Sequence, residues 1–159
     1  MSNAAALKQV YTLAIIKPDI LIKKKQSVDT ILQSIGERFT IHNDIKPINL
    51  SVTQAEQFYN DHRGKFFFER LVCFMTRGPI VPLILTEKNN DKNTITSWRE
   101  FIGPTHAENA RKIECLRGKY GSSDTWNGFH GSGSNDEATQ EINFFFPTFL
   151  NDTTVDHFK

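Results

Sequence analysis

The 159-residue sequence is poor in cysteine and has no long apolar run. Its two cysteines, Cys73 and Cys115, are too few for a disulfide framework and lack the spacing of a metal site, so we interpret both as free thiols in a reducing compartment. No apolar run approaches the roughly 18 residues that a membrane span needs, and the N-terminus lacks the apolar stretch of a signal peptide. We therefore expect a soluble, intracellular protein, with the cytoplasm as the default location. The first ten residues are too short and too poor in arginine to decide whether they form a mitochondrial signal.

The sequence also lacks a strong excess of charge of either sign. It has 19 Lys and Arg against 18 Asp and Glu, a formal charge of +1, so nothing in its overall charge predicts a nucleic-acid or membrane partner. The charges are unevenly placed, however. Residues 60–120 carry 11 basic and 7 acidic side chains, a net +4, whereas residues 121–159 carry 1 basic and 6 acidic, a net −5. The basic stretch suits a small anion such as a nucleotide.

The absence of repeats, low-complexity tracts and Pro/Gly/Ser linkers predicts one domain over residues 1–159, with a core from about 10 to 147. Apolar patterns alternate between strand and helix periods along the chain. We expect strands at residues 12–16, 39–48, 80–85 and 127–130, with a helix after Ser27, two helices between the second and third strands, a helix at 95–101, a short helix and loop within 106–126, and a last helix closed by Pro147. This is the βαββαβ order of a ferredoxin-like α+β sandwich with a four-stranded antiparallel sheet.

Local signals set the expected ends of these elements. Ser27 is a candidate cap for the first helix, and Gly36 is expected to end it. The tetrapeptides at 53–56 and 134–137 read as capping boxes that begin two later helices. Pro82 removes one backbone donor from the third strand and weakens the prediction of its register.

One short motif carries candidate chemistry: Asn127-Gly-Phe-His-Gly-Ser132, followed by Glu141. His130 is a candidate nucleophile, since Gly131 would leave room beside the imidazole for a polyanion and Glu141 could fix the tautomer. Glu141 lies near the middle of the predicted last helix, from which it can fold back on the histidine. Taken alone, a histidine beside Gly-Ser is more often a turn residue.

Several motifs together resemble the nucleoside diphosphate kinases, over residues 11 to 147. They are Ala14-Ile-Ile-Lys-Pro-Asp19, Tyr59 and Phe67 around a helix start, Arg99 with Gly103-x-Thr105, Leu116-Arg-Gly118, the His130 motif, and Glu141 ahead of Phe145-Phe-Pro147. Each piece alone has an ordinary explanation: a strand-end lysine, a solvated arginine or a core phenylalanine. Their shared order and spacing make the match specific. The segments 58–62, 66–72 and 74–80 most resemble the type-six branch of this family.

The resemblance implies a ping-pong reaction in which a nucleoside triphosphate such as ATP gives its terminal phosphoryl group to His130 and a nucleoside diphosphate then takes it away. Phosphoryl transfer requires in-line positioning and charge neutralisation, and neutral histidine is available as a nucleophile near pH 7. Magnesium is expected to arrive on the nucleotide phosphates, since the sequence holds no carboxylate cage for a dedicated metal site. Nucleoside di- and triphosphates are the implied partners.

The resemblance also implies roles for individual residues. Arg99, Thr105 and Arg117 would hold phosphate oxygens, and Lys17 would reach the ribose and the terminal phosphate. Asn127 would bond a sugar hydroxyl, and Phe67 would stack on the base, a contact that tolerates every base. Tyr59 would lie near Lys17. Ser132 and Glu141 would orient His130, and His62 matches a variable position near the phosphates.

Three departures from the family pattern leave alternatives open. Gly133 stands where the family usually has aspartate, which removes a carboxylate and loosens the turn after the nucleophile, so turnover is expected to be slow. The loop from Thr105 to Arg117 differs from the common form, and the chain ends soon after Pro147, without the segment that braces subunits in many relatives. A homo-oligomer is therefore one option rather than a firm expectation. A weakly active or inactive nucleotide-binding regulatory partner is the alternative to an active kinase.

Overall fold

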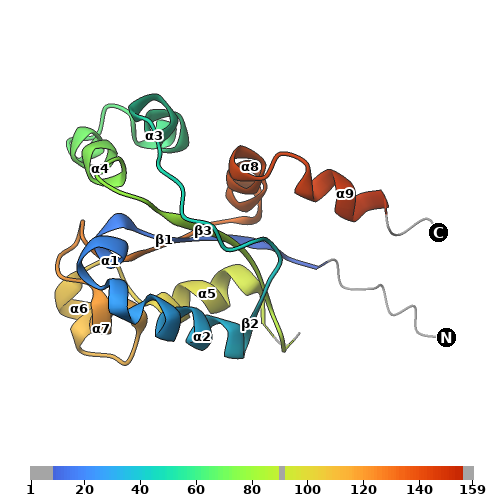
Figure 1. Ribbon diagram of the computed structural model, residues 1–159, viewed down its shortest axis with the longest axis horizontal. Helices are drawn as coiled ribbons and strands as arrows, with labels where there is room; N and C mark the ends of the chain where they lie inside the picture. Colours follow the sequence, from blue (N-terminus) through green and yellow to red (C-terminus); the bar gives the residue numbers. More distant parts are fainter. Residues whose placement is uncertain (1–8, 90–91, 156–159) are drawn as a thin grey trace.

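The computed structural model describes residues 9–89 and 92–155. In this part of the chain four strands form one antiparallel sheet, in the order β2-β3-β1-β4. The strands are β1 (Thr12–Ile16), β2 (Phe39–Ile41), β3 (Val81–Glu87) and β4 (Phe129–Gly131). Helices lie on both faces of the sheet (Figure 1), and this ferredoxin-like α+β architecture confirms the fold that the sequence predicts.

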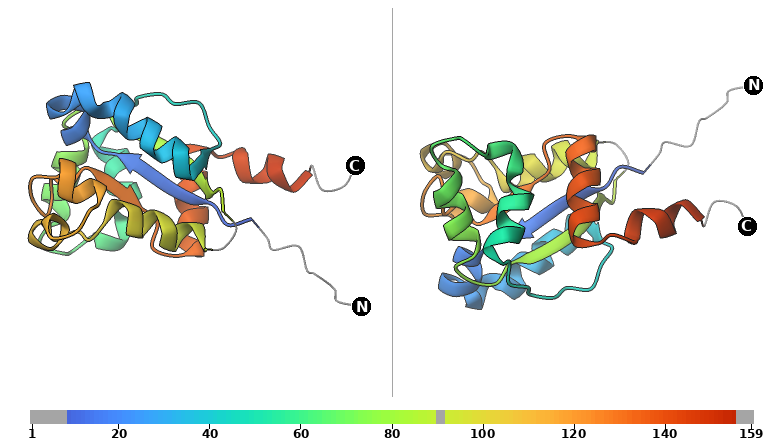
Figure 2. Two further views of the ribbon diagram at one scale, coloured as in Figure 1. Left: turned by 90° about the horizontal axis from the view of Figure 1, so that it is seen from below. Right: turned by 90° about the horizontal axis from the view of Figure 1, so that it is seen from above.

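The helices divide between the two faces of the sheet (Figures 1 and 2). One face carries α1 (Pro18–Lys23), α2 (Val28–Arg38), α5 (Thr94–Ile102), α6 (Ala107–Arg111) and α7 (Leu116–Tyr120), with the 3₁₀ turn η1 (Lys25–Ser27) between α1 and α2. The other face carries α3 (Val52–Phe58), the 3₁₀ turn η2 (Asn60–His62), α4 (Phe68–Met75) and α8 (Asn135–Phe145), and α9 (Phe149–Val155) continues beyond α8.

Strand β1 joins the two halves of the core because all five of its residues are buried. Leu13 and Ile15 pack with α3, α4 and α8, while Ala14 and Ile16 face the cluster around Trp98 of α5. Helices on both faces explain why this strand is a continuous apolar run and does not alternate with polar residues. Lys17 directly follows this buried strand and is itself buried.

The predicted second strand, 39–48, is only partly correct. Its first three residues form β2, the N–H of His42 still donates to the Ile84 carbonyl at 2.9 Å, and the backbone of Ile48 pairs again with Ile80, but residues 43–47 leave the sheet. Pro82 of β3 has no N–H to donate to a neighbouring strand, which interrupts a regular ladder here. The side chain of Asn43 fills the gap, because it accepts from the Ile84 N–H at 2.7 Å and donates to the Pro82 carbonyl at 3.1 Å.

Two predicted helix ends are corrected by the structure. Helix α2 runs through Gly36 to Arg38, so Gly36 lies inside the helix and does not end it. Helix α3 begins earlier than predicted, with Ser51 and Gln54 as its capping box in place of residues 53–56. Ser134 caps α8 as predicted. The predicted capping box at 134–137 is incomplete, because the Glu137 carboxylate accepts from the N–H of Gly133 and not from that of Ser134.

Helices α1 and α9 were not predicted from the sequence. Helix α1 begins at Pro18, a residue suited to a first helical turn, and α9 is held where Phe149 packs edge-on against Tyr11, with ring centroids 5.2 Å apart. The predicted strand at 127–130 begins two residues later and ends one residue later, as Phe129–Gly131. The structure does not test whether the first ten residues form a mitochondrial signal, because only residues 9 and 10 of this segment are described. None of the described helices is both long and apolar enough to cross a membrane.

Gly36→Ala is expected to stabilise the protein by about 0.5–1 kcal/mol, because alanine is the better helix former and a Cβ at this position has no heavy atom within 4 Å. Urea unfolding monitored by circular dichroism measures the change. Gly103→Ala is the matched control: its φ of +86° and a Cβ that would lie 2.3 Å from the sulfur of Cys115 predict destabilisation. A loss of stability in Gly36→Ala would mean that Gly36 does end the helix.

Candidate active site

The site is built around β4, a three-residue edge strand that carries His130. Its backbone pairs with β1, with His130 opposite Ile15. The indole Nε1 of Trp98 donates to the carbonyl oxygen of His130 at 2.9 Å, which fixes the strand from its second side. A Cβ on Gly131 would lie 2.6 Å from the Trp98 ring, so the glycine at this position makes room for the indole of Trp98. Gly131 also lines the cavity beside the imidazole, so this role is added to the expected one of leaving space for a ligand.

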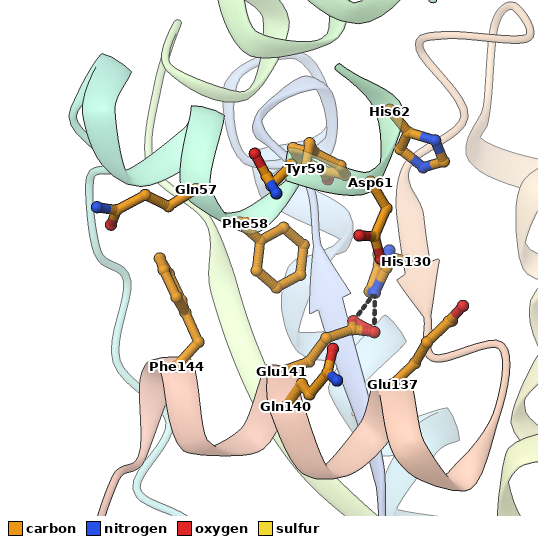
Figure 3. A pocket seen from close by; sticks show the side chains of 11 residues that line it. Gln57, Phe58, Tyr59, Asp61, His62, His130, Glu137, Gln140, Glu141 and Phe144 are labelled. Atoms are coloured by element: carbon orange, nitrogen blue, oxygen red, sulfur yellow. Dashed lines mark hydrogen bonds and ion pairs between the residues drawn. The ribbon is translucent and has the colours of Figure 1, made fainter. Parts of the chain in front are cut away.

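His130 and Glu141 form a hydrogen-bonded pair. The imidazole Nε2 lies 2.6 Å from Oε2 and 3.2 Å from Oε1 of Glu141, and the side chains are only 19% and 13% exposed (Figure 3). The carboxylate accepts a hydrogen bond, so it favours the tautomer with the proton on Nε2 and a lone pair on Nδ1. No described residue hydrogen-bonds to Nδ1. The pair therefore presents Nδ1 as the free nitrogen.

The Ser132 hydroxyl hydrogen-bonds to Leu13 and not to His130 or Glu141. Ser132 is fully buried, and its hydroxyl accepts from the N–H of Leu13 at 3.1 Å, while its own N–H donates to the Leu13 carbonyl at 3.2 Å. The serine thus extends the contact between β4 and β1 by one residue. It can influence His130 through the position of the strand, whereas the expected direct orientation of the imidazole is absent.

A cavity of about 690 Å³ lies on one side of His130; we call it the cationic cavity because Lys17, Arg70, Arg99 and Arg117 line it. Except for Ser132 and Glu141, it brings together every residue to which the sequence assigns a site role. These residues are Lys17, Tyr59, Phe67, Arg99, Thr105, Arg117, Asn127 and His130, with His62 beside them. Residues more than a hundred positions apart in the chain thus meet in one space next to the imidazole.

Lys17 is buried at the end of β1, and its ammonium group donates to Oδ1 of Asn127 at 3.0 Å. Burial, followed by the nearby Arg117, lowers the pKa of Lys17 to about 7, although Asp19 acts in the opposite direction. A bound anion would favour the charged form of this lysine. The cavity therefore holds an ammonium group whose charge depends on what binds there.

Asp19 is a site residue to which the sequence interpretation gave no role. Burial raises the pKa of its carboxyl, against the effects of Lys17 and of backbone N–H groups that include that of Gly128. The carboxyl lies beside the backbone of Gly128, next to Asn127. Its place two residues after Lys17 was the available signal. Trp98 was also missed, because only the folded sheet places residues 98 and 130 together.

The two arginines differ in how firmly they are held. Arg117 is half-buried and donates to the carbonyls of Gly103 at 2.7 Å and Phe129 at 2.8 Å. Burial and the positive charge of Arg99 lower the pKa of Arg117 to about 10, so it stays cationic at neutral pH. Arg99 is exposed and makes a long contact, 3.4 Å, to the Gly131 carbonyl. Thr105, also exposed, lies at the rim of the same cavity.

Aromatic side chains close the opposite wall. Tyr59 is 6% exposed, its ring centroid lies 6.5 Å from that of His130, and its hydroxyl has no hydrogen-bond partner among the described residues. Burial and the Glu141 carboxylate raise the pKa of Tyr59, so its hydroxyl keeps its proton and is available as a donor. Phe67 is half-buried just before α4, with His62 and the fully exposed Phe66 against its edges.

A second cavity, of about 370 Å³, lies on the Glu141 side of the imidazole (Figure 3). We call it the acidic cavity because Asp61, Glu137 and Glu141 line it, and no lysine or arginine of the described chain does. In Figure 3 Glu137, Gln140, Glu141 and Phe144 rise from α8, while Phe58, Tyr59 and Asp61 face them from the α3–η2 segment. The two cavities give the two faces of His130 opposite electrostatic environments, and an anion is favoured only on the Lys17 side.

Comparisons with known proteins agree with this geometry. The family model described as nucleoside diphosphate kinase matches residues 10–150. A probable nucleoside diphosphate kinase of Dictyostelium discoideum is 60% identical over 151 residues, which cover 88% of this chain and 94% of that protein. Nucleoside diphosphate kinase 6 of Danio rerio is 44% identical and covers 87% of this chain and 77% of its own, in line with the type-six resemblance.

The fold gives the same result. The crystal structure of the Aquifex aeolicus nucleoside diphosphate kinase superimposes with a TM-score of 0.77 at 36% identity, over 86% of this chain and 94% of that one. The sheet order, the convergence of the motif residues in the cationic cavity, and the family match are independent observations with one explanation. This chain belongs to the nucleoside diphosphate kinase family, whose members are nucleotide-binding phosphotransferase enzymes.

Proposed function

We propose that the protein transfers the terminal phosphoryl group of a nucleoside triphosphate to a nucleoside diphosphate by way of a phosphohistidine at His130. The observation that carries this proposal is the position of the imidazole: Nε2 is occupied by Glu141, and the free Nδ1 belongs to a side chain that lines the cationic cavity. A nucleophile with an oriented base partner is the arrangement expected for covalent catalysis.

In the first half-reaction Nδ1 attacks the terminal phosphorus, and the bond from phosphorus to the bridging oxygen breaks as the diphosphate leaves. The phosphorylated ring keeps its Nε2 proton and so carries positive charge, which the Glu141 carboxylate, 2.6 Å away, stabilises. In the second half-reaction a terminal oxygen of the acceptor diphosphate attacks the same phosphorus and restores the neutral imidazole. One cavity serves both halves, since donor and acceptor differ only in the phosphoryl group.

The charges of the cavity would neutralise the phosphates during transfer. Arg99 and Arg117 are suited to paired hydrogen bonds with phosphate oxygens, and Thr105 supplies a hydroxyl at the rim. The Tyr59 hydroxyl and the Lys17 ammonium are the donors on the walls near His130. Magnesium, bound to the nucleotide phosphates, would supply further neutralising charge. The protein side of the cavity is cationic, so a metal ion there would be held mainly through the phosphates.

The nucleoside would lie between Phe67 and Asn127. Phe67 offers a ring on which a base can stack, a contact that every base can make, so broad nucleotide use is expected. Asn127 is held by Lys17 through Oδ1 and by the Asp124 carbonyl through Nδ2, at 2.9 Å, which fixes its amide for contact with a sugar hydroxyl.

A regulatory protein that binds nucleotides without transfer is the second candidate. Gly133, in place of the usual aspartate, is the feature that favours it, because the turn after the nucleophile has lost a side chain. The two functions differ in one measurement: the regulatory protein would bind ATP and ADP in the same cavity but form no phosphohistidine.

His130→Ala is expected to abolish phosphoryl transfer from ATP to GDP in the presence of magnesium, because no other described histidine has a carboxylate-oriented imidazole between the two cavities. Incubation of the unaltered protein with ATP labelled at the terminal phosphate should give an acid-labile, base-stable label on the peptide that contains His130. His42→Gln, a change outside both cavities, should keep the label. Binding of ATP without labelling would favour the regulatory function.

Binding of ADP near pH 8 is expected to take up close to one proton. The pKa of Lys17 is about 7 in the free protein, so this lysine is mostly neutral at pH 8, and phosphate oxygens nearby would raise its pKa and charge it. Affinity should therefore fall as the pH rises above 7. Calorimetry in buffers of different ionisation enthalpy measures the uptake, and Lys17→Met should remove it. Equal uptake in both proteins would assign the proton to another group.

Phe67→Ala is expected to weaken ADP, GDP and CDP binding by similar factors, about tenfold or more, because stacking contributes about 1–3 kcal/mol per base and depends little on base identity. Phe67→Tyr keeps the aromatic face and should bind like the unaltered protein, whereas Phe67→Leu keeps only the apolar volume and should resemble the alanine variant. Equilibrium dialysis with each diphosphate gives the dissociation constants. A loss confined to one nucleotide would contradict stacking as the role of Phe67.

A further inference from the structure

The turn that follows the nucleophile is held by a carboxylate from the next helix. This turn, residues 132–134, connects β4, which carries His130, to α8, which bears Glu141. The carboxylate Oε2 of Glu137 accepts the N–H of Gly133 at 2.8 Å, and Glu137 lines both the cationic and the acidic cavity. Glu137 thus belongs to α8 but bonds to the backbone on the nucleophile's side of the turn.

Gly133 and Glu137 are complementary in space. A Cβ on Gly133 would lie 2.6 Å from Oε2 of Glu137, so a side chain at residue 133 and this position of the carboxylate exclude one another. Gly133 is not among the glycines with positive φ, so its backbone does not require glycine. Backbone strain therefore does not require glycine at 133, and the missing side chain leaves the space that Oε2 of Glu137 occupies.

We propose that Glu137 is a positioning residue for the reaction: it locks the Gly133 turn and thereby sets the distance between His130 and Glu141. This inference rests on the proposed phosphohistidine function. Glu137 and Glu141 lie one helical turn apart on α8 and face the same cavity (Figure 3), so a shift of this turn moves the two members of the pair relative to each other. The carboxylate that position 133 lacks is supplied in this chain from position 137.

The loss of this contact is expected to slow the chemical step. Glu137→Ala frees the Gly133 amide and should lower kcat about tenfold, because a small misplacement of reacting groups is costly. KM should change little, because the residues proposed to bind the nucleotide are all retained. Glu137→Gln keeps an oxygen that can accept the same hydrogen bond and should recover most of the activity. Asp136→Ala is the matched control, since it removes a neighbouring exposed carboxylate from the same first turn of α8.

A swap of the side chains tests the complementarity directly. Gly133→Asp alone introduces a Cβ against Oε2 of Glu137 and should lower kcat, as should Glu137→Ala alone. The double variant Gly133→Asp/Glu137→Ala removes the clash and returns a carboxylate to the turn, so its kcat should exceed that of either single variant. Additive losses in the double variant would overturn the proposal.

A spectroscopic readout separates this inference from the proposed function. The imidazole ¹⁵N shifts of His130 report its tautomer and its hydrogen bond to Glu141, and they should change in Glu137→Ala but not in Asp136→Ala. A variant with lower thermal stability but unchanged His130 shifts and kcat would make Glu137 merely structural. If the unaltered protein transfers no phosphoryl group, the proposed function fails. The ¹⁵N shifts then still decide whether Glu137 positions His130: altered shifts support the role and unaltered shifts overturn it.

Discussion

The hydrogen bond from the Trp98 indole to the His130 carbonyl, together with the β1–β4 pairing, is the constraint on which the site depends. A three-residue edge strand has little stability of its own, and its position comes from what surrounds it. Arg117 donates to the Phe129 carbonyl, and Ser132 bonds to the backbone of Leu13. Each of these contacts fixes backbone and leaves the imidazole free to react.

The electrostatic design follows from the same placement. His130 lines two cavities. Lys17 just after β1, Arg70 of α4, Arg99 of α5 and Arg117 of α7 line one of them. Asp61 of η2 and Glu141 of α8 line the other, and Glu137 of α8 lines both. Lys17 is buried where its charged form is disfavoured, and Asp19 acts against the effects of burial and of Arg117. In the free protein Lys17 is therefore only partly protonated near neutral pH. A bound anion would favour its protonated, charged form.

Much of the fold and most of the cavity residues could be predicted from the sequence, because strands and active-site motifs are local signals. β1 was predicted from a buried apolar run, and its end delivers Lys17 to the cavity. The errors arise where a partner distant in sequence decides the outcome. Residues 43–47 leave the sheet next to Pro82, which lies on another strand and has no N–H to donate to them. Helix α9 packs against Tyr11. Trp98 and Ser132 likewise act through contacts that no sequence spacing reveals.

At Gly133 the chain departs from the family motif, but the turn is still held by a carboxylate, that of Glu137. A comparison by position counts this glycine as a lost carboxylate and a loosened turn. In the folded chain the third residue of α8 lies beside the turn, so a glutamate at 137 reaches the Gly133 amide that a side chain at 133 would crowd. The proposed reaction requires a fixed distance between His130 and Glu141, and the role proposed for Glu137 is to hold that distance from position 137 through the Gly133 amide. Glycine at position 133 therefore changes which residue holds the turn after His130, and it is weak evidence against catalysis.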